Sequence, residues 1–118
     1  MIRAASQTTV DPLPEPPEHL GPEATYYWCR TVETFDLELH QLRLLRMLCE
    51  CWDTMQRARA VISELGETYL DRWEAPKSRP EVAILRDARS QYLKLHGELG
   101  LDYPPPHGAR VFRPAEDD

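Results

Sequence analysis

The sequence predicts an all-α protein with a three-helix core, a long central helix and a disordered tail at each end. Apolar residues recur at helical spacing in three stretches, glycine and proline stand at the ends of those stretches, and further prolines gather outside them. The 118 residues, 42% of them hydrophobic, suffice for one domain. We expect a disordered Pro-rich arm over residues 1–21, a helical domain over 22–101 and a flexible Pro-rich acidic tail over 102–118.

The first helix is predicted to begin at Gly21-Pro22-Glu23. Glycine suits the cap, proline fits the first helical position, and the carboxylate lies near the positive end of the helix dipole. One face of about three to four turns then has helical spacing, and its residues are Ala24, Tyr27, Trp28, Thr31, Val32 and Phe35.

The second helix is predicted to be capped by Asp36 and to end at Gly66. It has about 27 residues and a length of ~40 Å at 1.5 Å per residue. A helix this long exceeds what one small domain can cover, so part of its apolar face is predicted to contact a neighbouring subunit. The residues expected at this interface are Trp52, Leu48, Met55 and Trp28.

Residues 66–79 break the helical period. Tyr69 to Glu74 are predicted to form a short irregular or hairpin segment, which Pro76 ends. A third helix should begin at Pro80 and end at a left-handed cap at Gly100. Its apolar stripe consists of Val82, Leu85, Ala88, Tyr92, Leu95 and Leu99.

The composition excludes several classes of function. The sequence has no apolar run long enough to span a membrane, and the N-terminus does not resemble a signal peptide. Cys49 and Cys51 would point about 200° apart on a helix, so a metal site built from them with Cys29 and His40 is not expected. No phosphate-binding loop, serine elbow or zinc-protease motif is present. We therefore expect a protein that is not an enzyme and has no cofactor.

Two groups of basic residues are candidates for binding DNA, although the formal net charge is −6. Arg72, Lys77 and Arg79 lie in the non-helical segment near Trp73, where they suit phosphate contacts; an ordinary polar loop is the alternative. Arg43 and Arg46 lie on a polar face of the second helix with Glu50, Asp53 and Arg57. Because these residues can pair at i, i+4, a solvated salt-bridged face is the alternative there.

The C-terminal tail contains one hydrophobic cluster in a charged, Pro-rich context. Val111 and Phe112 stand between Arg110 and Arg113. Short clusters of this kind commonly order when they bind a partner, so we expect Val111 and Phe112 to dock onto one. A solvated tail without a binding role is the alternative.

The order of several motifs resembles the family of small terminase subunits of tailed phages. The motifs are Trp28 in the first helix, Leu45-x-x-Leu48-Cys49-Glu50-Cys51-Trp52, Gly66, Pro80 and the closing Glu98-Leu99-Gly100-Leu101. Two features depart from the family. Gln41 stands where an aspartate is frequent, and Asp102-Tyr103-Pro104 stands where the family usually continues with Thr-Pro.

The resemblance implies a non-enzymatic, helical protein that forms a ring of about eight to eleven subunits by closed symmetry. Such a ring would bind viral double-stranded DNA in the host cytoplasm. It would also regulate the large terminase subunit, which holds the ATPase and nuclease activities. The partner predicted for Val111 and Phe112 is then this large subunit. A small helical DNA-binding regulator and a helical adaptor that binds only protein remain as alternatives.

Overall fold

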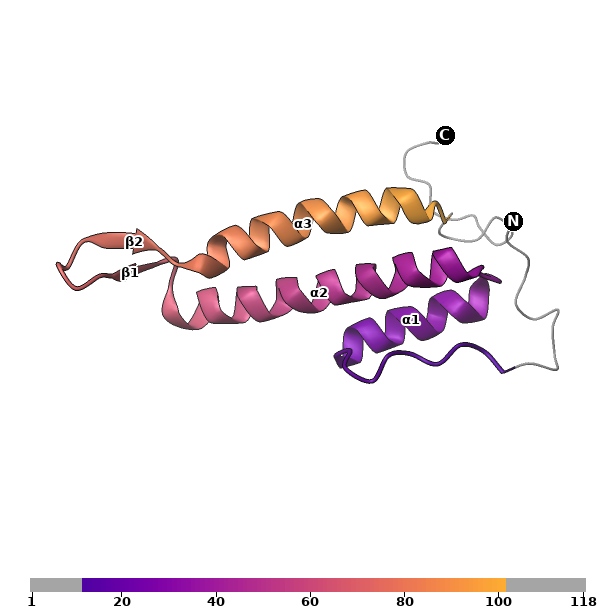
Figure 1. Ribbon diagram of the computed structural model, residues 1–118. Helices are drawn as coiled ribbons and strands as arrows, with labels where there is room; N and C mark the ends of the chain where they lie inside the picture. The colour runs from indigo at the N-terminus through magenta and orange to yellow at the C-terminus, as the bar shows by residue number, and fades with distance from the viewer. Residues whose placement is uncertain (1–11, 102–118) are drawn as a thin grey trace, which may run out of the picture.

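The computed structural model describes residues 12–101, and they form three helices and a small β-hairpin (Figure 1). Helix α1 spans Pro22–Thr34, α2 spans Leu39–Leu65 and α3 spans Pro80–Leu99, with strands β1 (Thr68–Leu70) and β2 (Pro76–Ser78) between α2 and α3. The predicted all-α fold class is confirmed. Helices α2 and α3 form an antiparallel pair, α1 lies beside the first half of α2, and the β-hairpin projects from the opposite end.

Most helix ends follow the predicted signals. Pro22 and Pro80 stand in the first turns of α1 and α3, and Gly100 has the left-handed φ of 67° that a glycine cap permits. The predicted cap of α2 at Asp36 is wrong, because α2 is capped by Glu38. The Glu38 side chain accepts from the backbone amide of Gln41, and the Glu38 amide donates to Gln41 Oε1 at 2.9 Å.

The segment between α2 and α3 is a two-stranded antiparallel hairpin, one of the two forms that the sequence predicted. Its register pairs Thr68 with Ser78, Tyr69 with Lys77 and Leu70 with Pro76. Pro76 was expected to end the extended segment, but it opens the second strand instead. A two-stranded ribbon has only edge strands, where a residue without an amide proton is tolerated.

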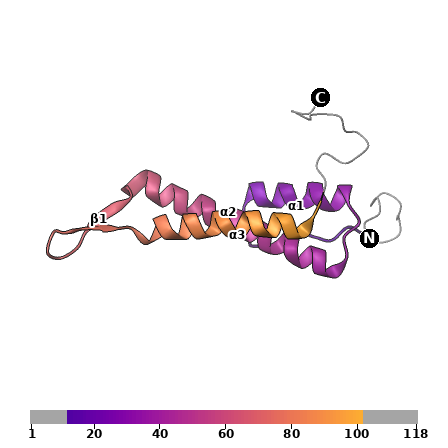
Figure 2. The same cartoon turned by 90° about the horizontal axis from the view of Figure 1, so that it is seen from above.

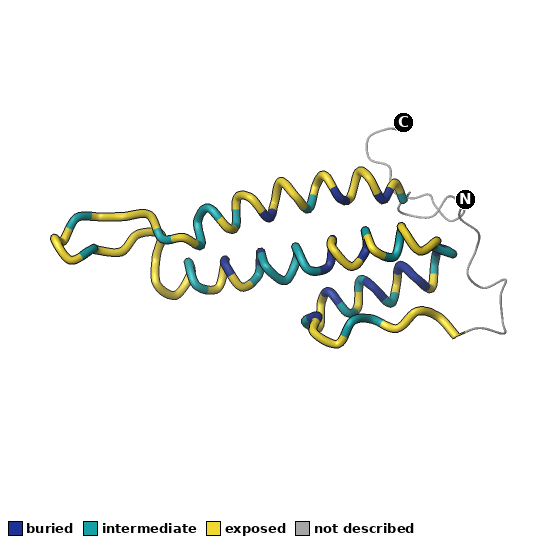
Figure 3. The backbone as a smooth tube through the Cα atoms, viewed as in Figure 1, coloured by how far each residue is buried: buried dark blue, intermediate teal, exposed yellow. Residues whose placement is uncertain are grey.

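The molecule has two ends of different character (Figure 3). At the three-helix end, α1 and the last turns of α3 cover the first half of α2 around a shared apolar core. That core consists of Leu20, Ala24, Trp28, Val32, Leu45, Leu48, Cys49, Leu95 and Leu99. The hairpin end, residues 55–88, extends away from α1 (Figure 2). Its buried residues are Met55, Ala58 and Ala88, and two of these are small enough for close helix packing.

Residues 12–21, part of the arm predicted over residues 1–21, make contacts with the helices. The indole Nε1 of Trp28 donates to the carbonyl of Pro14 at 3.0 Å, and Leu20 is buried in the core. A Pro-rich segment supplies many carbonyl acceptors, and one of them satisfies the indole N–H.

Residues 1–11 and 102–118, which include Val111 and Phe112, lie outside the described residues. Within residues 12–101, no helix is long and apolar enough to cross a bilayer.

Candidate functional site

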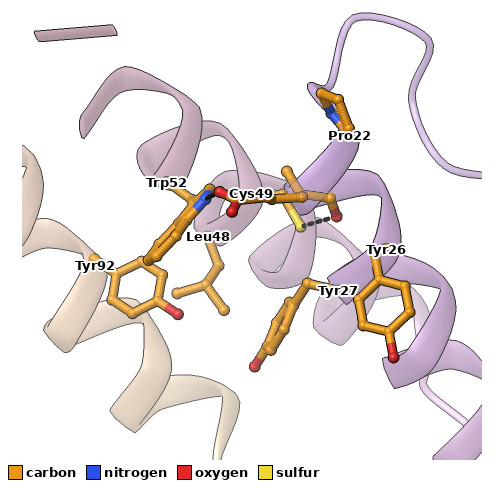
Figure 4. A pocket seen from close by; sticks show the side chains of 9 residues that line it. Pro22, Tyr26, Tyr27, Leu48, Cys49, Trp52 and Tyr92 are labelled. Carbon is orange, nitrogen blue, oxygen red and sulfur yellow. Dashed lines mark hydrogen bonds between the residues drawn. The ribbon is translucent and has the colours of Figure 1, made fainter. Parts of the chain in front are cut away.

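An aromatic hollow opens where the three helices meet (Figure 4). Its volume is about 470 Å³. Pro22, Glu23, Ala24, Tyr26 and Tyr27 line it from α1, Leu48, Cys49 and Trp52 from α2, and Tyr92 from α3. Figure 4 shows the Trp52 and Tyr92 rings on one side and the two tyrosines of α1 on the other, with Leu48 between them. The hollow is therefore a ready-made site for an apolar or aromatic side chain.

Trp52 is held in this hollow by one hydrogen bond and one ring contact. Its Nε1 donates to Glu23 Oε1 at 3.0 Å, and its ring centroid lies 5.9 Å from that of Tyr92 with the planes tilted by 52°. Glu23 is the one formally charged residue of the lining. The hollow thus has an apolar interior with a single negative group.

Cys49 forms part of the floor and acts as a small packing residue. Its Sγ lies 3.6 Å from the carbonyl oxygen of Ala24, where α1 and α2 approach closely. Burial, together with the smaller effects of the Asp53 and Glu50 charges, raises the pKa of the Cys49 thiol to about 12. The thiol is therefore protonated and unreactive at neutral pH. Among residues 12–101, no group of three or more His, Cys, Asp or Glu side chains could hold a metal ion.

Three of the four predicted interface residues lie inside the protomer. Leu48 is 0% exposed, and Met55 and Trp28 are each 5% exposed. Trp28 and Leu48 belong to the core shared by the three helices, and Met55 is buried farther along α2, so these side chains cannot contact a second copy unless the protomer rearranges. Trp52, the fourth, is half-buried and lines the hollow.

Arg79, predicted to contact DNA, instead joins the β-hairpin to the end of α2. Its Nε donates to the Gly66 carbonyl at 2.9 Å, and its Nη2 donates to the carbonyls of Leu65 at 3.2 Å and Thr68 at 3.1 Å. The last carbonyls of a helix have no partner within that helix, and a cation beside them also favours the helix dipole. The Arg79 guanidinium is therefore occupied within the chain.

The turn of the hairpin is an ordered structure that presents an exposed tryptophan. Asp71 Oδ1 accepts from the backbone amides of Trp73 at 2.8 Å and Ala75 at 2.9 Å. The Arg72 guanidinium lies 4.5 Å from the centre of the Trp73 ring, and Lys77 Nζ lies 4.0 Å from Asp71 Oδ2. The sequence indicated Trp73 only as a neighbour of the basic residues Arg72, Lys77 and Arg79. The structure exposes 73% of it at the tip of the molecule.

The hairpin is not a basic patch. Between Glu67 and Arg79 the chain has three acidic residues (Glu67, Asp71 and Glu74) and three basic ones (Arg72, Lys77 and Arg79), a formal sum of zero. Arg79 is occupied by carbonyls, and Lys77 lies beside Asp71. Leu70 and Trp73, 64% and 73% exposed, add apolar surface beside these charges.

The acidic residues on the polar face of α2 bind the segment that precedes α1. Arg46 Nε donates to Glu50 Oε2 at 3.1 Å, the expected i, i+4 pair, and His19 Nε2 lies 2.7 Å from the same oxygen. Asp53 does not form the predicted pair with Arg57 but accepts from the Gly21 amide at 2.8 Å. Partial burial acts to raise the pKa of Glu50, but the hydrogen bonds from Arg46 and His19 outweigh it and lower that pKa.

The exposed charges that remain on this face are basic. Arg43 is exposed, and Arg57, also exposed, donates to Thr54 Oγ1 at 3.3 Å. Glu50 pairs with Arg46 and Asp53 accepts from the Gly21 amide, so within residues 12–101 neither carboxylate pairs with Arg43 or Arg57.

The chain matches one family model, described as "Phage terminase, small subunit", over residues 28–111. The matched span runs from the middle of α1 through α2, the β-hairpin and α3. No curated protein and no solved structure is similar enough to match.

Proposed function

The chain belongs to the family of phage terminase small subunits, and from that membership we propose that it forms a ring, binds viral double-stranded DNA and regulates the large terminase subunit. The match over residues 28–111 is the observation that carries this proposal. Family membership gives the chain a role in phage DNA packaging. The proposed role is that of a binding subunit without catalytic residues or cofactor, acting in the host cytoplasm.

Assembly is supported by the apolar surface of the hairpin end. Leu65, Leu70, Trp73 and Ile84 are large hydrophobic side chains that this end leaves exposed. Apolar side chains gathered on the surface of a soluble protein often mark a binding site. A second copy would cover them, and a ring of about eight to eleven copies would do so for every subunit.

Arg43, Arg46 and Arg57 on α2 are the first proposed DNA contacts. They share one face, where Glu50 pairs with Arg46 and Asp53 accepts from the Gly21 amide, so Arg43 and Arg57 are the arginines of this face that neither carboxylate pairs with. Arg72 and Lys77 form a second candidate surface on the hairpin. Arg79 is not among the proposed contacts, because its guanidinium donates to three carbonyls. A few arginines per subunit bind weakly, but a ring presents many copies at once, which raises the overall affinity.

The test compares two double variants that remove equal charge from different helices. We expect Arg43→Ala/Arg57→Ala to weaken binding to duplex DNA and to flatten its salt dependence, because fewer counterions are released. Arg86→Ala/Arg89→Ala, on exposed positions of α3, should bind as the wild type does. Affinity would be measured by fluorescence anisotropy at several salt concentrations, with assembly mass checked in parallel.

Three outcomes discriminate between the surfaces. If only the α3 variant weakens binding, the proposed α2 surface is wrong. If Arg72→Ala/Lys77→Ala weakens binding while leaving the mass unchanged, the hairpin is the DNA surface. If no variant changes binding and the wild type has no measurable affinity for duplex DNA, the chain is a helical adaptor that binds only protein.

A further inference from the structure

The tip of the β-hairpin is an ordered turn that presents the side chain of Trp73 to solvent. The Asp71 carboxylate fixes the turn through the amides of Trp73 and Ala75, and Arg79 fixes the base of the hairpin to the end of α2. Trp73 is nevertheless 73% exposed. Because the turn is already ordered, binding through this indole would cost little conformational entropy. Tryptophans in such positions commonly dominate the binding energy of an interface.

The aromatic hollow is the complementary feature on the same chain. Its lining is aromatic and aliphatic apart from Glu23, and its volume of about 470 Å³ suits a large side chain. Tyr26, at its rim, is 66% exposed. The hollow therefore combines an apolar interior with a carboxylate close to its opening.

The charges beside the two features also match. Arg72 carries its guanidinium over the Trp73 ring at 4.5 Å, so a cation would enter the hollow together with the indole. Glu23 offers a carboxylate there, and one of its oxygens already accepts from Trp52 Nε1. DNA is a poor occupant of this hollow, because a polyanion would meet aromatic rings and a carboxylate.

The hairpin cannot fold back into the hollow of its own chain. Trp52 lies 13 residues before the end of α2 at Leu65, which is about 20 Å of helix at 1.5 Å per residue. The hairpin then continues away from α1 (Figures 1 and 2). A Trp73 tip that occupies this hollow must therefore come from another copy of the chain.

We propose that the Trp73 tip of one copy inserts into the aromatic hollow of a second copy, with Arg72 beside Glu23. This contact rests on the proposed ring assembly and specifies how it is made. It joins two different surfaces of the same chain, so in a pair the first copy keeps a free hollow and the second keeps a free tip for the next neighbours. Such head-to-tail contacts generate rings when the rotation closes.

The test uses one variant of each surface and a mixture of the two. Trp73→Ala removes the tip, and Tyr26→Arg places a cation at the rim of the hollow. Both positions are largely exposed, so we expect the fold to survive, which circular dichroism would check. The controls are Leu93→Ala and Leu93→Arg, on an exposed α3 residue that belongs to neither surface. Masses would be measured by light scattering.

Each variant alone should associate roughly tenfold or more weakly than the wild type, as expected for a hot-spot residue, and approach the monomer mass of 13.7 kDa. The equimolar mixture should form a dimer of about 27 kDa, twice 13.7 kDa. Trp73→Ala keeps an intact hollow and Tyr26→Arg keeps an intact tip, so one productive contact remains. Both Leu93 controls should keep the wild-type mass.

Several results would overturn the proposal. If the wild type forms a ring and both variants keep its mass, the ring stands and this contact is wrong. If Trp73→Ala dissociates the assembly and Tyr26→Arg does not, the tip binds a surface other than the hollow. If Tyr26→Arg abolishes binding of the large subunit and keeps the mass, the hollow holds that subunit. If the assembly requires residues 102–118 and tolerates Trp73→Ala, the tail is the occupant. A wild type that stays monomeric removes both the ring and this contact.

Discussion

The two ends of α2 lie in different environments although they belong to one continuous helix. At the three-helix end, α1 and α3 bury Leu45, Leu48 and Cys49 almost completely. At the hairpin end only α3 accompanies α2, and Leu65 is 56% exposed. Apolar residues of α2 thus stabilise the protomer where another helix covers them and remain exposed where none does. Both the turn and the face that a side chain occupies decide which role it has, since Leu39 at the three-helix end is 64% exposed and Met55 at the hairpin end is buried.

Charged side chains differ between the two ends in the same way. At the three-helix end, Glu50 and Asp53 bind residues 19–21, so they add an N-terminal segment to the core. At the hairpin end, Arg79 binds carbonyls of Leu65, Gly66 and Thr68 and orients the hairpin. The first set contributes to the folded core, and the second holds an exposed structure in place.

The largest expected effect comes from truncating one leucine at each end of α2. Leu48→Ala should lower the free energy of unfolding by about 2 to 5 kcal/mol, because it leaves a cavity in a fully buried position. Leu65→Ala, the matched change at the exposed end, should cost less than ~1 kcal/mol in the protomer. Urea denaturation at low protein concentration would measure both. Equal losses would show that the hairpin end also has a core that stabilises the protomer.

An intermediate effect is expected at the junction between α2 and the hairpin. Arg79→Ala removes the donors for three carbonyls, and we expect a local loss of about 1 to 2 kcal/mol. Hydrogen exchange should accelerate at the amides of Asp71 and residue 79, which donate across the hairpin to the carbonyls of Ala75 and Glu67, while global unfolding changes little because the hairpin lies outside the core. Arg72→Ala, on the same hairpin but not bonded to carbonyls, is the control. Unchanged exchange in Arg79→Ala would contradict the role of Arg79 in fixing the hairpin.

The smallest effect concerns the pH dependence that Glu50 gives to the three-helix end. Its pKa in the folded state lies below the ordinary value of 4.5, since the hydrogen bonds from Arg46 and His19 outweigh the effect of burial. The associated stability is therefore present above the unfolded pKa and is lost as the pH falls through the folded pKa. The side chain is 39% exposed, so solvent screening limits this contribution to less than ~1 kcal/mol.

Glu50→Gln should therefore destabilise the protein slightly at pH 7 and approach wild-type stability as the pH falls through the folded-state pKa of Glu50. His19→Ala should have a partial effect, because Arg46 still donates to the carboxylate. Thermal unfolding of the three proteins across this pH range would measure the difference. A constant offset between Glu50→Gln and the wild type at every pH would contradict the assignment.

Local signals in the sequence predicted most of the fold. Proline and glycine predicted the beginning of α1, the end of α2 and both ends of α3, and helical periodicity predicted the faces that pack. The start of α2 was misplaced because Asp36 and Glu38 are both carboxylates close to the helix start. The choice of Glu38 depends on Gln41, which completes the capping box.

The candidate site was less predictable because it depends on contacts between distant residues. Trp28, Leu48 and Met55 were predicted at an interface, since the sequence does not show which turns of α2 are covered by α1 and α3. The role of Arg79 depends on carbonyls 11 to 14 residues earlier in the chain. The aromatic hollow combines residues from three helices, so no local motif indicates it.

We propose that the three-helix end stabilises the protomer while the hairpin end makes the assembly. The most direct test is the solution mass of Trp73→Ala beside that of the wild type, by light scattering at tens of micromolar. We expect the wild type at about 110 to 150 kDa, eight to eleven copies of 13.7 kDa. We expect Trp73→Ala near the monomer mass, with an unchanged melting transition at low concentration. A Trp73→Ala protein that keeps the full wild-type mass, or a wild type that is itself monomeric, would contradict this division between the two ends.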